Sequence, residues 1–167
     1  MAQKYSQIIK KLGPSQVRLD EPMAKHTTFK IGGPADLYVE VNEEAELIEL
    51  IKLIRGLEIP YFIMGGGSKV LVSDEGFRGV VIVIHNTQCA IRNTKIIAEA
   101  GVLLETLVNQ SAKAGLTGLE FAAGIPGTLG GAVRGNAGAW QQDIGNLVNR
   151  VKILNKKNKV NWLSKKS

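Results

Sequence analysis

Two glycine-rich segments contain the residues of this sequence that are best suited to binding chemistry. The first is Gly65, Gly66, Gly67, Ser68 and Lys69, directly after a short apolar run. Glycine admits positive φ and close backbone approach, so consecutive N–H groups can form an anion-binding nest, with the Ser68 hydroxyl as a further donor. The segment lacks both the ending of a Walker loop and the spacing of the dinucleotide fingerprint. It therefore favours a diphosphate ligand, with a purely structural turn as the alternative.

The second segment is denser in small residues. Its candidate contact residues are Gly124, Ile125, Pro126, Gly127, Thr128, Gly130 and Gly131. Because glycine at this density fits poorly in a regular helix or strand, we expect a loop pressed against a flat ring system. A tight loop packed on neighbouring backbone is the alternative.

The first segment requires strands and a helix to position it. Residues 36–41 alternate apolar and polar side chains, which predicts a strand. A helix with Asn42 as N-cap and an end at Gly56 follows. The apolar runs at residues 61–64 and 79–84 predict two more strands, so the order is β-α-β-β.

The second segment lies in a similar mixture of elements. Residues 95–100 predict a strand, and Leu104, Leu107 and Ser111 repeat at helical spacing. Residues 148–163 predict a hairpin around a turn after Leu154. The fold class is therefore mixed α/β (α+β).

Composition excludes several classes of protein. The chain has 167 residues and a formal net charge of +6, and Cys89 is its single cysteine. One thiol can form neither an internal disulfide nor a zinc site, which fits a reducing cytoplasm. The start lacks the apolar run of a signal peptide, and the longest apolar run, residues 80–84, is too short to cross a bilayer. We therefore expect a soluble protein without a metal or a membrane anchor.

Positive charge gathers near the end of the chain. The lysines there are Lys152, Lys156, Lys157, Lys159, Lys165 and Lys166. Most sit at turn-like or terminal positions, and Trp162 is the one aromatic residue between them, which favours a solvated surface over a nucleic-acid patch. We expect no nucleic-acid partner, and the sequence leaves the oligomeric state open.

Four segments, taken in order, resemble the UDP-N-acetylenolpyruvoylglucosamine reductase family. They are residues 27–35, 65–77, 115–131 and 136–139. Each is a weak signal alone, but four in this order and spacing are specific, and the match runs from about Pro22 onward. The resemblance implies a two-lobed FAD-binding fold of the vanillyl-alcohol-oxidase type.

The resemblance also implies the domain layout and the cofactor contacts. Residues 1–21 would be an extension, residues 22–88 the first lobe and residues 89–167 an incomplete second lobe. In the family, the first glycine segment lines the FAD diphosphate and the second lies beside the flavin. Lys69 departs from the usual asparagine; it can neutralise a phosphate but cannot accept a hydrogen bond.

The implied attachment of FAD is non-covalent. Neither glycine segment contains a histidine or cysteine, the residues that bind FAD covalently in some enzymes of this fold. His26, His85 and Cys89 lie outside both segments and are expected to be ordinary structural or surface residues.

The implied reaction reduces UDP-N-acetylglucosamine enolpyruvate to UDP-N-acetylmuramate, with NADPH as hydride donor, in cytoplasmic peptidoglycan precursor synthesis. The family's catalytic arginine, serine and glutamate have no counterpart in these residues, so no catalytic residue is assigned. We expect an N-terminal segment, without the substrate-binding third domain, that is inactive by itself. Two alternatives stay open: a non-catalytic flavin- or nucleotide-binding module, and a basic nucleic-acid-binding protein.

Overall fold

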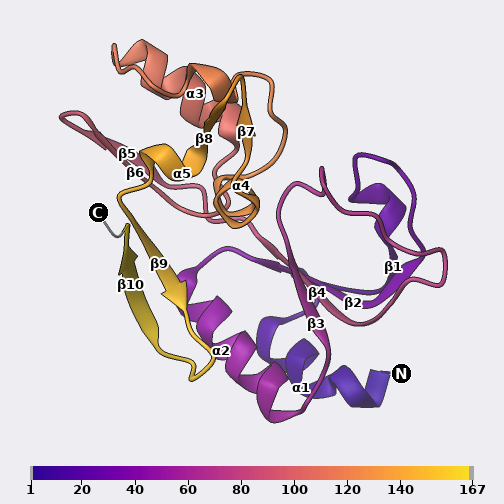
Figure 1. The fold of residues 1–167 in the computed structure, drawn as a ribbon. Coiled ribbons are helices and arrows are strands. Elements are labelled where there is room, and N and C mark those ends of the chain that lie inside the picture. Colours follow the sequence, from indigo (N-terminus) through magenta and orange to yellow (C-terminus); the bar gives the residue numbers. More distant parts are fainter. Residues whose placement is uncertain (1, 166–167) are drawn as a thin grey trace. The chain divides into compact units, whose positions relative to one another are not determined.

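The computed structural model describes residues 2–165, which form two compact units (Figure 1). The first unit extends to Asn86 and the second begins at Thr87. Each unit has its own buried apolar residues and is described by itself. No helix in residues 2–165 is long and apolar enough to span a membrane.

A four-stranded sheet organises the first unit. Its order is β1 (Val17–Pro22), β2 (Pro34–Val41), β4 (Phe77–Ile84) and β3 (Tyr61–Met64). β1 is antiparallel to β2, whereas β2, β4 and β3 are parallel. The three predicted strands, one from alternation and two from apolar runs, are therefore confirmed. Because β3 and β4 are parallel neighbours, their carboxyl ends lie side by side.

The two central strands of the sheet, β2 and β4, are buried on both faces. Leu37, Val39 and Val41 of β2 are fully buried, as the alternation predicts. Tyr38, which points the other way, is also buried, in a cluster with Val81 of β4. Burial on both sides explains why β4 is a continuous β-branched run and not an alternating pattern.

α2 (Glu44–Gly56) confirms the predicted helix, but the predicted cap was wrong. The N-cap is Glu43, because the chain stays extended through that residue and no side chain caps the helix. The backbone N–H of Asn42 instead donates to the Glu46 carboxylate, at 3.2 Å.

Residues before Pro22, expected as an extension, are structured. α1 (Ala2–Leu12) and β1 lie in the same compact unit as the rest of the sheet. Tyr5 and Ile8 of α1 are 0% exposed, so this helix contributes side chains to the core.

The second unit contains three two-stranded antiparallel sheets and short helices. In chain order the elements are β5 (Cys89–Arg92), β6 (Lys95–Ala98), α3 (Leu104–Lys113), α4 (Leu129–Gly135), β7 (Gly138–Ala139), β8 (Gln142–Asp143), α5 (Ile144–Leu147), β9 (Arg150–Leu154) and β10 (Val160–Ser164). A 3-10 turn of the first unit (Met23–Lys25) has a counterpart here at Glu120–Ala122.

Two predictions in the second unit are confirmed. α3 buries Leu104, Leu107 and Ser111, the predicted face. The β9–β10 hairpin forms around a turn in which the Asn155 side chain accepts from the backbone N–H of Lys157, at 2.8 Å. Local turn chemistry of this kind is readable from sequence.

Candidate functional site

The first glycine segment begins where β3 ends and is fixed in place at Gly67. That residue is buried with φ +65°, in the left-handed region. A Cβ there would collide with the carbonyl oxygen of His26. The carbonyl of Gly67 also accepts from the N–H of Thr28, at 3.1 Å. The loop is therefore seated on residues 26–28, which come far earlier in the chain.

The other residues of the segment are more accessible. Gly66 and Lys69 are exposed, and Gly65 and Ser68 are half-buried. A loop fixed at one buried glycine, with a basic side chain and exposed backbone beside it, has the composition of an anion-binding turn.

Charged and aromatic groups support the floor of this loop. His26 Nε2 lies 2.9 Å from Glu21 Oε1, and its ring stacks on Tyr38 with 4.2 Å between centroids. Burial alone would raise the pKa of Glu21, but the hydrogen bond from His26 and the charge of Lys25 hold that pKa below its usual range. A carboxylate in this state can anchor the His26 ring. Sequence analysis missed this role of His26, for which the only signal was its position beside Thr27 and Thr28.

A second close contact joins the segment after the loop to the residues before β2. The N–H of Gly33 donates to the carbonyl of Ser73 at 2.9 Å. A Cβ on Gly33 would collide with the carbonyl oxygen of Asp74. Glycine is therefore required there by close backbone packing.

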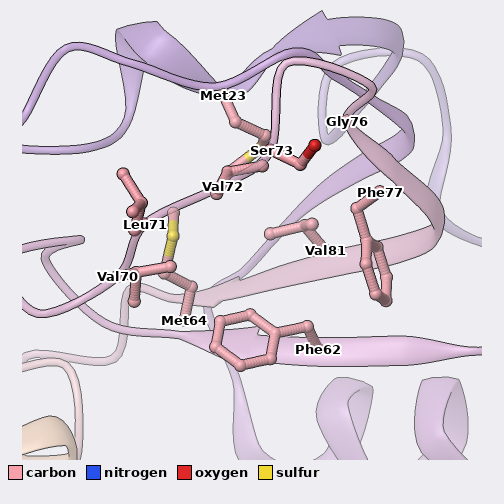
Figure 2. Close-up of a pocket in the computed structure, with 10 residues that line it drawn as sticks. All are labelled: Met23, Phe62, Met64, Val70, Leu71, Val72, Ser73, Gly76, Phe77 and Val81. Carbon is pink, nitrogen blue, oxygen red and sulfur yellow. The ribbon is translucent and has the colours of Figure 1, made fainter.

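An apolar pocket of about 190 Å³ lies directly beyond the glycine loop (Figure 2). Its lining residues are Met23, Phe62, Met64, Val70, Leu71, Val72, Ser73, Gly76, Phe77 and Val81. All belong to the first unit, and the Ser73 hydroxyl is the only polar side-chain group among them. An apolar slot beside an anion-binding turn can hold a molecule that combines a flat ring with phosphate groups.

The prediction that the second glycine segment is a loop throughout was wrong, because its later part is helical. Gly130 and Gly131 form the first turn of α4. The N–H of Gly130 donates to the carbonyl of Ala100 at 2.8 Å, and a Cβ on Gly130 would lie 2.9 Å from that of Ala100. Tight packing on neighbouring backbone, the alternative interpretation, therefore accounts for Gly130.

The earlier part of the segment is irregular, as predicted. Gly124 and Gly127 have φ of +84° and +119°. Nothing lies within 4 Å of a Cβ built on Gly124, whereas the carbonyl of Gly127 accepts from the N–H of Leu104. Ile125 is half-buried and Pro126 is exposed. Contacts within the second unit thus fix Gly127 but leave space at Gly124.

Thr128 caps α4, and this contact gives a testable prediction. Its hydroxyl accepts from the N–H of Gly131, at 3.4 Å, and the residue is buried. We expect Thr128→Ala to lower the free energy of unfolding by about 1 kcal/mol, the usual cost of losing such a cap. Denaturant unfolding measures this, with Thr117→Ala, at an exposed position, as control. Equal stability of the two variants would contradict the assigned cap.

The two glycine segments lie in different units. That both contact one FAD molecule, as the resemblance implies, stays a prediction. Cys89, on β5, is half-buried, and burial raises the pKa of its thiol, which disfavours a reactive thiolate. Among the residues that the structure describes, no group of three His, Cys, Asp or Glu side chains could hold a metal ion.

Comparison with known proteins identifies the family. Residues 35–164 match the family model described as FAD binding domain. The UDP-N-acetylenolpyruvoylglucosamine reductase of Caldanaerobacter subterraneus subsp. tengcongensis is 44% identical over 165 residues, covering 98% of this chain and 54% of that protein. The reductase of Clostridium tetani is 45% identical over 96% of this chain and 52% of its own length. The chain thus spans about half the length of these relatives.

Solved structures agree on the fold. UDP-N-acetylenolpyruvylglucosamine reductase from Thermus caldophilus superposes with a TM-score of 0.74 at 32% identity, covering 89% of this chain and 53% of that one. An alkyldihydroxyacetonephosphate synthase gives a TM-score of 0.71 at 20% identity, covering 99% of this chain and 35% of that one, and this match shows the fold alone. The predicted resemblance and the vanillyl-alcohol-oxidase type of fold are confirmed. The chain belongs to the FAD binding domain family.

Proposed function

We propose that this chain supplies the FAD-binding part of a UDP-N-acetylenolpyruvoylglucosamine reductase. The observation that carries the proposal is the glycine loop at the end of β3, seated by Gly67 on His26 and opening beside an apolar pocket. The names of the relatives at 44% and 45% identity support the substrate class.

The proposed reaction reduces the enolpyruvyl group of UDP-N-acetylglucosamine enolpyruvate, with NADPH as hydride donor, in peptidoglycan precursor synthesis in the cytoplasm. FAD held by these residues would supply the hydride-transfer chemistry of this reaction. The chain's own residues bind and orient the cofactor. The groups that stabilise and protonate the substrate would lie outside these residues.

Each part of the first site suits one part of the cofactor. Backbone N–H groups of Gly65 to Ser68 would bind the diphosphate, and the Lys69 ammonium would offset its charge. The neighbouring pocket would take a planar ring, since its lining is almost wholly apolar. FAD would be held without a covalent bond, because neither glycine segment contains a histidine or cysteine.

The second segment would contact the ring system through its backbone. Gly124 has open space where a Cβ would stand, and Gly127 adopts a φ that side chains disfavour. A ring could therefore approach this backbone closely without meeting a side chain. Gly130 and Gly131 would act indirectly, by allowing α4 to pack and to hold the preceding loop.

Titration of the purified chain with FAD tests the proposal. We expect saturable binding, seen as a change in flavin fluorescence, and no turnover when NADPH and the enolpyruvyl sugar nucleotide are added. Absence of flavin binding would refute the assignment. Turnover at a rate normal for enzymes, about 1 to 10³ per second, would show that the catalytic groups lie within these residues. Salt-sensitive retention on DNA without flavin binding would favour the nucleic-acid alternative.

A further inference from the structure

A polar network in the first unit joins α1 to Arg78, which directly follows the pocket residue Phe77; it is buried at Tyr5 and Asp36 and exposed at Arg78. The Tyr5 hydroxyl donates to Asp36 Oδ2 at 2.8 Å, and Asp36 Oδ1 lies 2.9 Å from Arg78 Nη1. Tyr5 is 0% exposed and Asp36 is 6% exposed. Of the two oxygens of this buried carboxylate, Oδ2 accepts a hydrogen bond from α1, whereas Oδ1 forms an ion pair with Arg78 of β4 without hydrogen-bond geometry.

Arg78 continues the network into backbone. Its Nη2 donates to the carbonyl of Pro34 at 2.9 Å and to the carbonyl of Glu75 at 3.0 Å. A guanidinium is planar and presents its donors in a fixed geometry. Nη1 of that plane lies at the Asp36 carboxylate while Nη2 meets Glu75, so a shift at one end of the plane moves the other.

Glu75 belongs to a turn that forms part of the pocket wall. We define the pocket turn as residues 73–77, of which Ser73, Gly76 and Phe77 line the pocket. The carbonyl of Ser73 accepts from the N–H of Gly76 and from that of Gly33, each at 2.9 Å. A Cβ on Gly76 would collide with the carbonyl oxygen of Pro34, so the turn is packed closely against the start of β2.

We propose that Tyr5 is a positioning residue for the cofactor pocket, acting through Asp36 and Arg78 on the pocket turn. Tyr5 does not line the pocket, so its effect on a ligand is indirect, and we assign it to this network. The inference rests on the proposed function, which places FAD at this pocket and the adjoining glycine loop.

The protonation state of Tyr5 suits this role. Burial, and then the hydrogen bond to Asp36, raise the pKa of Tyr5 to about 12. The phenol therefore remains a donor throughout the neutral range. Without its hydroxyl, one buried oxygen of Asp36 would lose its partner, and the carboxylate would be free to turn toward Arg78 and displace the guanidinium.

Tyr5→Phe tests the proposal, with Tyr61→Phe as a matched control. The Tyr61 hydroxyl also pairs with an arginine, accepting from Arg55 Nη2 at 2.9 Å, and Tyr61 is not among the residues that line the pocket. Two quantities are measured on the 167-residue chain: amide hydrogen exchange at Gly76 without flavin, and the FAD dissociation constant by fluorescence. For Tyr5→Phe we expect exchange about tenfold faster and FAD binding about three- to tenfold weaker. For Tyr61→Phe we expect both within about twofold of the original chain.

A double-mutant cycle separates positioning from a general loss of stability. In an Arg78→Lys background, Tyr5→Phe should cause no further loss of FAD affinity, because the route to the pocket turn is already broken. Equal losses in both backgrounds would overturn the proposal. If Tyr5→Phe does not fold, Arg78→Lys alone must speed exchange at Gly76, and unchanged exchange would overturn it.

The remaining outcomes are also decisive. Unchanged exchange at Gly76 in Tyr5→Phe refutes the network. Faster exchange with unchanged FAD affinity refutes its role at the pocket. If the original chain does not bind FAD, the proposed function fails, while the exchange measurement still decides whether Tyr5 holds the pocket turn.

Discussion

Gly67→Ala is expected to weaken FAD binding by a factor of 100 or more, as an order of magnitude. Gly67 is buried at φ +65°, and a Cβ there would collide with the carbonyl oxygen of His26. Alanine in the left-handed region costs about 1–2 kcal/mol, and the collision requires the loop to move off its floor. Each 1.4 kcal/mol of lost binding free energy weakens affinity tenfold. We expect the backbone strain and the displacement of the loop from its binding geometry to cost two such steps or more. Fluorescence titration with FAD measures the change.

Gly115→Ala is the matched control for that variant. Gly115 follows α3 with φ +69°, and nothing lies within 4 Å of a Cβ built on it. It therefore bears the same backbone cost without a collision, so stability should fall by about 1 kcal/mol while FAD affinity is retained. Similar FAD affinities for the two alanine variants would show that the close packing of Gly67 against the His26 carbonyl is not needed for FAD binding.

Elements with a long and regular pattern could be predicted from the sequence. The helix α2 and the strand β2 have apolar periods that indicate one local structure, and β4 is a β-branched run of the kind that favours a buried strand. The α4 helix could not be predicted, because its glycines are unfavourable in helices and are explained only by packing. Gly130 lies against Ala100, from a different part of the chain, and no local pattern contains that contact.

The same limit applies to the candidate site. Residue type alone indicated that the Gly65 loop could bind an anion, since glycine and serine supply backbone and hydroxyl donors. The packing of that loop against residues 26–28 joins two segments that are remote in sequence. The Arg78 contact with the carbonyl of Pro34 and the buried Tyr5–Asp36 pair likewise join α1, β2 and β4. Periodicity reports which side chains are buried, but not which remote partners they meet.

Gly66→Asp is expected to weaken FAD binding on the order of 10²-fold, whereas Lys157→Ala should leave it unchanged. Gly66 is exposed in the proposed diphosphate loop and is not among the glycines with positive φ, so a side chain adds no left-handed strain there. Lys157 lies in the exposed hairpin turn of the second unit, where its N–H bonds Asn155. The contrast therefore compares a charge added at the loop with a charge removed from a solvated turn.

Gly66→Asn separates the added charge from the added volume, since it has the same shape as the aspartate. Two unit charges about 4 to 8 Å apart repel by about 2–4 kcal/mol at an effective dielectric of 20, which supports the expected factor for aspartate. The asparagine variant should lose much less affinity, and the difference between the two should shrink as salt rises, because ions screen exposed charges. FAD titrations at low and high salt measure both effects. If the aspartate and asparagine variants bind FAD equally at low salt, the anionic diphosphate does not lie at this loop, because a negative charge beside it could not be without effect.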